Sequence, residues 1–94
     1  MKTIKGFKLR KLGDEYILVG ETIELINFNK MITLNETAGF LWQQAEKQTA
    51  ENGSFSADSL GEALLAEYEV SPEQAAKDIK ETIASWLEAG IIEQ

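Results

Sequence analysis

The chain has 94 residues, of which 44% are hydrophobic and 27% charged, and its net charge at pH 7 is −7. A chain of this length forms one hydrophobic core without room for a deep catalytic cavity, so we expect a single domain over residues 1–94. It has no cysteine and no histidine, which excludes disulfides, thiol nucleophiles and imidazole metal ligands. The sequence has no targeting segment and no membrane-spanning run, and we expect a cytoplasmic protein that does not bind membranes.

Charge is unevenly distributed along the chain. Residues 1–30 carry six basic and four acidic side chains, whereas residues 31–94 carry three basic and twelve acidic ones. A protein that reads duplex DNA needs a basic face that neutralises phosphates. The helices predicted below lie in the acidic part, which argues against a nucleic-acid partner.

Alternating apolar and polar residues, or runs of β-branched and aromatic ones, predict four extended segments in the first third of the chain. They cover residues 7–12, 15–19, 22–28 and 31–34. Gly13-Asp14 predicts a two-residue hairpin turn between the first two segments. The apolar parity slips between Leu25 and Ile26, where we expect a bulge or a change of register.

The sequence period changes from two to about 3.6 at Asn35. Asn35 is a favourable N-cap residue, and Glu36 lies in the first turn, where a carboxylate complements the helix dipole. We therefore predict that a strand ends directly at the start of a first helix, at about residues 36–46. Residues 47–55 are expected to form a loop.

A second helix is predicted at about residues 57–69, with Ser56 at its start. An apolar stripe runs along it and consists of Leu60, Leu64, Leu65 and Tyr68. Gly61 within this helix costs roughly 1 kcal/mol relative to alanine, and we expect that close helix packing explains it.

The third helix has the strongest start signal. In Ser71-Pro72-Glu73-Gln74, the serine is the N-cap, the proline takes the first helical position and the glutamine completes a capping box. The helix is predicted at about residues 72–89 and ends at Gly90. Ile91 and Ile92 are then expected to fold back on the core.

The order of elements indicates an α+β fold. An N-terminal antiparallel sheet of three or four strands is followed by three helices joined by short connections, which is typical of a winged helix-turn-helix-like domain.

The titratable side chains do not indicate catalysis. Acid–base chemistry needs ionisable groups held in a pocket, whereas the helical carboxylates fall on polar faces that we expect to be solvated. These carboxylates are Glu46, Glu62, Glu67, Glu69, Asp78, Glu81 and Glu88. No glycine-rich phosphate loop occurs in the sequence. We therefore expect no enzyme activity, no cofactor and no metal.

Two features favour a role in binding. Trp42 and Trp86 fall on apolar stripes, where core packing is the simplest interpretation. Trp86, however, lies towards the edge of its stripe, and beside it Thr82, Ser85 and Ala89 form a weakly polar strip of small side chains with room for an extended segment.

The small sheet also has edges, and an unpaired edge is a template for an added strand. The same edge can recruit a second copy, so the protein can be a monomer or a homodimer.

Two motifs resemble the coenzyme PQQ synthesis protein D (PqqD-like) family, also known as the RiPP recognition element. One is a strand that ends in Leu34-Asn35, followed by a polar pair, a small residue and the apolar helix start up to Trp42. The other is Asp78-Ile79 with a spaced apolar stripe and the end Gly90-Ile91-Ile92. The resemblance spans about residues 7 to 92.

The resemblance implies a non-catalytic adaptor that captures the leader segment of a ribosomally made precursor peptide. The leader adds as a strand to the sheet edge against the third helix and is presented to a separate modifying enzyme, such as a radical SAM maturase. The peptide-binding residues implied are Ile26, Asn27, Phe28, Met31, Ile32, Thr33, Leu34, Thr82, Ser85, Trp86 and Ala89. Which strand forms the edge is left open, because residues 22–28 can cover it. The alternatives are a winged-helix nucleic-acid-binding protein and a stand-alone dimerisation or interaction module.

Overall fold

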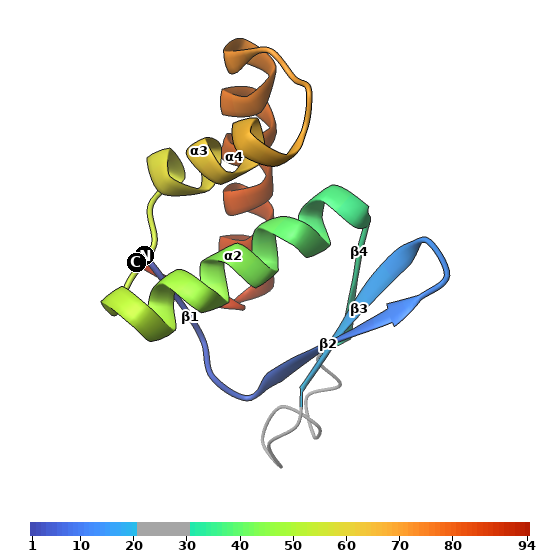
Figure 1. Cartoon of the computed structure of the whole chain (residues 1–94). Helices are drawn as coiled ribbons and strands as arrows, with labels where there is room; N and C mark the ends of the chain where they lie inside the picture. Colours follow the sequence, from blue (N-terminus) through green and yellow to red (C-terminus); the bar gives the residue numbers. More distant parts are fainter. Residues whose placement is uncertain (21–30) are drawn as a thin grey trace. The chain divides into compact units, whose positions relative to one another are not determined.

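The computed structural model describes residues 1–20 and 31–94, and in this part of the chain antiparallel strands are followed by three helices (Figure 1). The elements are β1 (Lys2–Thr3), β2 (Phe7–Leu12), β3 (Glu15–Gly20), β4 (Met31–Leu34), α2 (Glu36–Asn52), α3 (Ala57–Glu67), α4 (Pro72–Ala89) and β5 (Ile92–Glu93). This order confirms the predicted α+β class. The extended segment predicted at 22–28, with its bulge at Leu25 and Ile26, lies outside the described residues.

The chain folds into two compact units. The sheet unit, Ile4–Phe40, contains β2, β3, β4 and the first turn of α2. The helical unit combines Met1–Thr3 with Leu41–Gln94 and contains the rest of α2, α3 and α4, together with the short strands β1 and β5.

The sheet unit is an antiparallel sheet in the order β2-β3-β4. Leu12 pairs with Glu15, so Gly13 and Asp14 form the predicted two-residue hairpin loop. Gly13 has φ +62°, a conformation that costs glycine little and that a tight hairpin turn requires. Both predicted strands of this hairpin, and the turn between them, are confirmed.

The register gives the sheet one buried face and one exposed face. Leu9, Leu18 and Ile32 are cross-strand neighbours on the first face, and Leu18 is fully buried. Side chains alternate along a strand, so the neighbouring positions Lys8, Val19 and Met31 share the opposite face, where Met31 is exposed. The half-buried alternation predicted from the sequence is therefore present in the fold.

The junction between β4 and α2 is as abrupt as the sequence predicts. Asn35 caps the helix, since its side-chain Oδ1 accepts a hydrogen bond of 2.8 Å from the Ala38 N–H. The Asn35 carbonyl oxygen also accepts one of 2.8 Å from the Gly39 N–H. Asn35 thus ends the strand. Its side chain satisfies one of the first free N–H groups of the helix, and its carbonyl oxygen accepts the first intrahelical hydrogen bond.

Gly39 brings this first turn of α2 against the sheet. It is buried, and a Cβ atom at this position would lie 2.7 Å from Cγ and 2.8 Å from Cε2 of the Tyr16 ring. Tyr16 belongs to β3 and pairs with Leu34 of β4. The glycine therefore permits a contact between helix and ring that any other residue would obstruct.

Two tryptophans form the centre of the helical unit. Trp42 of α2 and Trp86 of α4 are 0% and 2% exposed, and their rings meet edge to face with centroids 5.2 Å apart. Phe55 adds a second edge-to-face contact with Trp86, at 6.5 Å. Aliphatic side chains complete this core, namely Leu41, Leu60, Leu64, Ile79 and Ile91.

The first helix is longer than predicted. It continues to Asn52, so the prediction of a loop over 47–55 was wrong for its first six residues. The apolar stripe ends near Ala45, but the following residues are good helix formers apart from Thr49 and the last residue, Asn52. The helix stops before Gly53, which has φ +84° and donates its N–H to the Thr49 carbonyl oxygen at 2.8 Å.

The predicted first residues of α3 and α4 are confirmed, but the capping box predicted for Ser71 and Gln74 was wrong. Ser71 Oγ accepts a hydrogen bond from the Gln74 N–H at 3.1 Å. The Gln74 side-chain amide donates to Asp78 Oδ1, 2.8 Å away along α4. A reciprocal capping box forms instead at the start of α3, where Ser56 and Ser59 each accept from the other's N–H at 3.0 Å.

The ends of these two helices differ in how well they were predicted. Helix α3 ends at Glu67 rather than residue 69, because Tyr68 already has extended backbone angles. Helix α4 ends at the predicted Gly90, which has φ +76°. The Ile91 N–H then reaches back to the Trp86 carbonyl oxygen at 3.1 Å, as in a Schellman motif.

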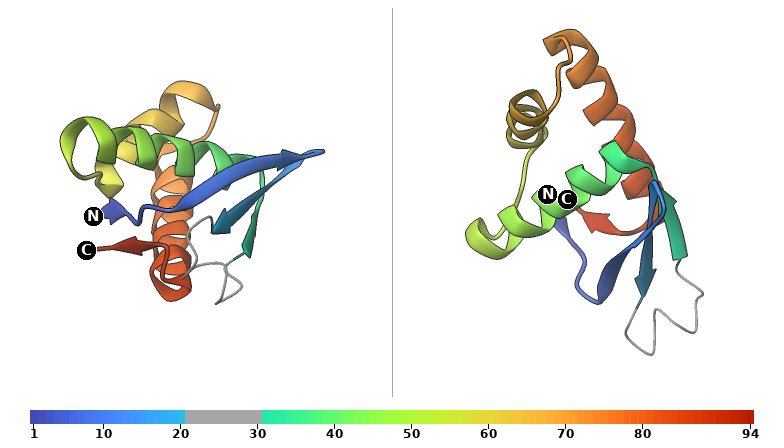
Figure 2. Two further views of the ribbon diagram at one scale, coloured as in Figure 1. Left: turned by 90° about the horizontal axis from the view of Figure 1, so that it is seen from below. Right: turned by 45° about the vertical axis from the view of Figure 1, so that its right-hand side comes forward.

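The two chain ends of the helical unit pair with each other, which sequence analysis did not predict. Strand β1 lies antiparallel to β5, with Lys2 opposite Glu93 and Thr3 opposite Ile92 (Figure 2). The Lys2 Nζ is 3.5 Å from Glu93 Oε1, but both side chains are exposed, so this ion pair stabilises little. Ile91 and Ile92 are buried, which confirms that they fold back on the core.

Candidate functional site

The predicted strand residues of the site lie together in β4. Among residues 1–20 and 31–94, β4 is an edge strand of the sheet and pairs only with β3. Met31 is 66% exposed and Thr33 is exposed, whereas Ile32 is half-buried and Leu34 buried. The strand therefore has one face anchored in the core and one open to solvent. The other three predicted strand residues, Ile26, Asn27 and Phe28, lie outside the described residues.

The predicted helix residues of the site lie in the second half of α4. Thr82, Ser85 and Ala89 are spaced by three and four residues, so they line one face of the helix. Ser85 is exposed, and Thr82 and Ala89 are half-buried. Trp86 is different, because its ring is packed between Trp42 and Phe55. Its side chain is part of the core of the helical unit, beneath this part of α4.

The described residues of the predicted site thus fall into two sets. Met31–Leu34 belong to the sheet unit, and Thr82, Ser85, Trp86 and Ala89 belong to the helical unit. Each set consists of neighbours within one regular element, so each is held by backbone hydrogen bonds rather than by a loop.

The carboxylates behave largely as the sequence predicts. Most of those assigned to solvated faces are exposed, namely Glu62, Glu67, Glu69, Glu81 and Glu88, and Asp78 is half-buried. In the described part of the chain, no cluster of three or more potential ligands is placed to hold a metal ion. The described helices include none that is long and apolar enough to cross a membrane.

Glu46 is an exception to the predicted solvated faces, because it is half-buried. Burial raises the pKa of the Glu46 carboxyl, and hydrogen bonding from the Trp42 side chain, one helical turn earlier, acts in the opposite direction. Burial disfavours the charged form of the carboxyl, and it is the stronger of the two influences on the pKa.

We expect Glu46→Gln to stabilise the protein near pH 7 and to lose this advantage in acid. The pKa of Glu46 is raised on folding, so the folded state loses stability as the pH rises from the unfolded pKa through the folded one. Glutamine removes this loss. Melting temperatures are measured from pH 4 to pH 8. The melting temperature of the variant should exceed that of the wild type by an amount that grows as the pH rises. Glu51→Gln on the same helix is the control, because Glu51 is exposed. A gap of constant size across this range would contradict the prediction.

Sequence analysis missed two features of the surface and core. One is the contact of Gly39 with the Tyr16 ring, for which a glycine at the start of an otherwise favourable helix is the only signal. The other is an open apolar groove between α3 and α4. Gly61 was predicted to allow close packing, but a Cβ at this position would have nothing within 4 Å, so that explanation was wrong.

Comparison with known proteins identifies the family. The family model of coenzyme PQQ synthesis protein D (PqqD) matches residues 15–92, whereas no curated protein sequence matches. Two solved structures share the fold. TbiB1, in complex with the TbiA(beta) leader peptide, has a TM-score of 0.72 and 17% identity, over 99% of this chain and 95% of that one. Lasso peptide synthetase B1, complexed with the leader peptide, has a TM-score of 0.71 and 19% identity, over 99% and 96%. Since the family model covers most of its length, this chain belongs to the coenzyme PQQ synthesis protein D family.

Proposed function

We propose that residues 1–94 act as one adaptor domain, which binds the leader segment of a ribosomally made precursor peptide and presents it to a separate modifying enzyme. The adaptor takes no part in the chemistry and works in the cytoplasm. Both structural neighbours, TbiB1 and lasso peptide synthetase B1, are bound to leader peptides. The membership of the PqqD family supports the same role, and a radical SAM maturase is the kind of enzyme that fits it.

The observation that carries the proposal is the edge position of β4 in the sheet formed by residues 1–20 and 31–94. An edge strand has backbone N–H and C=O groups that point away from its neighbour and can pair with an added strand. β4 has no proline to interrupt such pairing. Its inner residue Leu34 is buried, and Asn35 ties its end to α2. These contacts anchor the Leu34 end of β4 before the peptide arrives, and an ordered edge lowers the entropy lost on binding.

Helix α4 supplies the side-chain contacts in this proposal. Thr82, Ser85 and Ala89 are small, so a peptide backbone can approach the helix along this face. Trp86 supports the face from within the core. Residues 31–94 carry a large excess of acidic side chains, which favours a leader with lysine or arginine near α4.

The decisive experiment uses leader peptides that are N-methylated at alternate residues. In an added strand, only every second N–H points towards the edge of the sheet. We therefore expect one N-methylated set to abolish binding and the set shifted by one residue to bind nearly as well as the unmodified leader. A short precursor-like reading frame beside the gene for this chain would supply the probe, a synthetic leader peptide, and its affinity is measured by isothermal titration calorimetry.

NMR titration of the labelled protein with the unmodified leader locates the site. Amide shifts should concentrate in residues 31–34 and 78–89. Shifts confined to α2 and α3, or equal losses of affinity for the two N-methylated sets, would show that the peptide does not bind as a strand at β4.

A further inference from the structure

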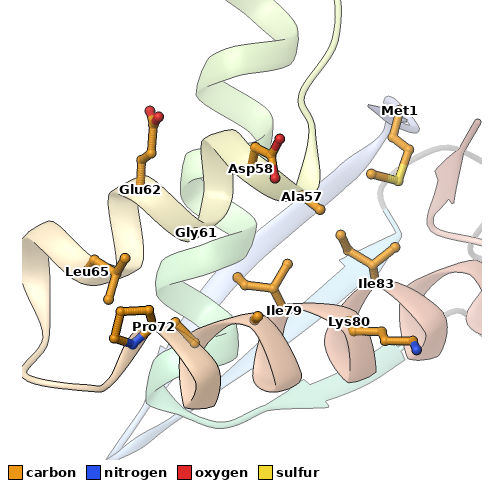
Figure 3. A pocket seen from close by; sticks show the side chains of 12 residues that line it. Met1, Ala57, Asp58, Gly61, Glu62, Leu65, Pro72, Ile79, Lys80 and Ile83 are labelled. Atoms are coloured by element: carbon orange, nitrogen blue, oxygen red, sulfur yellow. The ribbon is translucent and has the colours of Figure 1, made fainter.

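An open apolar groove of about 650 Å³ lies between helices α3 and α4 within the helical unit (Figure 3). Its floor is formed by Ala75, Ile79 and Ile83 of α4, all buried or nearly so. Ala57, Gly61 and Leu65 line the α3 side at intervals of four residues, which places them on one helical face. We refer to these six residues as the α3–α4 groove.

The α3–α4 groove exposes apolar surface that the fold leaves uncovered. Leu65 is 42% exposed, one of three large hydrophobic residues with this degree of exposure in the described part of the chain. Gly61 faces open space in the middle of a helix, where glycine is less stable than alanine. Packing against the described residues explains neither the exposure of Leu65 nor the glycine at position 61.

The two walls of the groove carry opposite charges. Asp58 and Glu62 stand on the α3 side, and Lys80 stands on the α4 side (Figure 3). The groove therefore has an apolar floor with two carboxylates on the α3 side and one amine on the α4 side.

This charge pattern selects one kind of occupant. A helix with an apolar stripe, a basic flank and an acidic flank complements the floor and both walls, as flanking charges set partner choice in coiled coils. Helix α3 has 11 residues and is about 16 Å long at 1.5 Å per residue, which matches three turns of such a helix.

The α3–α4 groove is also separate from the proposed leader site on α4. At 100° per residue, the direction of Ile79 and Ile83 is about 105° round the helix from the mean direction of Thr82, Ser85 and Ala89. The two faces of α4 can therefore be occupied at the same time.

We propose that the α3–α4 groove is a second docking surface, which takes an amphipathic helix of a partner protein with one basic and one acidic flank. The partner helix packs its apolar stripe on Ile79, Ile83 and Leu65 and completes a three-helix arrangement with α3 and α4. Its basic flank lies along Asp58 and Glu62, and its acidic flank along Lys80. This surface goes beyond leader binding and does not depend on it.

The test uses a synthetic helical peptide of about 18 residues, or five turns. It carries leucine on one face, lysine along one flank and glutamate along the other, and a scrambled peptide of the same composition is the control. Fluorescence anisotropy should show saturable binding of the patterned peptide only. Amide shifts should centre on Gly61, Ala76 and Ile79. Equal binding of both peptides, or shifts centred on residues 82–89, overturns the proposal.

Two variants sharpen the test. Gly61→Leu fills the groove and is expected to weaken peptide binding at least tenfold, while helix propensity keeps the melting temperature equal or higher. Asp58→Lys/Glu62→Lys should weaken binding similarly, and a peptide with glutamate on both flanks should restore it. Neither variant should change leader affinity, so failure here is distinct from failure of the proposed function. Unchanged peptide affinity in Gly61→Leu, or a dimer in sedimentation experiments that excludes the peptide, would refute the partner helix.

Discussion

Replacing Gly39 by alanine is expected to destabilise the protein by about 1–3 kcal/mol, the usual cost of overpacking a filled site. Alanine normally favours a helix over glycine by up to about 1 kcal/mol. At Gly39 the added Cβ would lie 2.7 Å from the Tyr16 Cγ atom, so the ring or the helix start must move. Tyr16 is in the central strand of the sheet and is half-buried, which makes such a movement costly. The clash should therefore outweigh the gain in helix propensity.

Gly61→Ala is the matched control for this prediction. It is also a glycine within a helix, but a Cβ at position 61 meets nothing within 4 Å. Alanine should therefore stabilise the protein by up to about 1 kcal/mol. Urea unfolding followed by circular dichroism should place the two midpoints on opposite sides of the wild-type midpoint. Equal stabilisation by both substitutions would mean that Tyr16 does not restrict the start of α2.

Local signals in the sequence predicted most of the element boundaries. Gly13 at positive φ, Asn35 as N-cap, Ser71 before Pro72 and Gly90 after α4 all act on the nearest few residues. Each signal reflects one hydrogen bond or one backbone conformation. Such features can be read from a short stretch of sequence because no distant residue takes part in them.

Features that depend on distant residues were predicted poorly. The pairing of β1 with β5 joins residues about 90 positions apart, and two-residue strands have no periodic pattern to detect. The extension of α2 to Asn52 follows from the helix propensity of polar residues after the apolar stripe has ended. The need for glycine at position 39 follows from its contact with the Tyr16 ring, which the sequence does not reveal.

In the candidate site, too, local features were predicted and those that depend on distant residues were not. The sequence indicated that β4 lacks proline and that the strip of Thr82, Ser85 and Ala89 is small, and the structure places both sets on regular elements. Trp86 was the ambiguous residue, because a tryptophan at the edge of an apolar stripe can face either the core or a groove. Its burial against Trp42 and Phe55 depends on α2 and on the connection between α2 and α3, which helical periodicity alone does not reveal.

Trp86→Ala is expected to destabilise the protein by about 3–5 kcal/mol, the range for removing a large aromatic side chain from a core. The indole is 2% exposed and loses two edge-to-face contacts, at 5.2 Å and 6.5 Å between centroids. Small domains are stable by only about 5–15 kcal/mol, so the variant should be partly unfolded well below the wild-type melting temperature. Leader binding should decline in parallel with the folded fraction.

Two further variants separate a core role of Trp86 from a direct role in peptide binding. Trp86→Phe keeps an aromatic ring beside Trp42 and should retain most of the stability and the leader affinity. Ser85→Ala changes an exposed neighbour on the proposed peptide face and should alter stability by no more than about 0.5 kcal/mol. Thermal unfolding and leader titration are measured on each variant. If Trp86→Ala kept the wild-type melting temperature and lost only leader affinity, the indole would be a contact of the peptide rather than the support beneath its site.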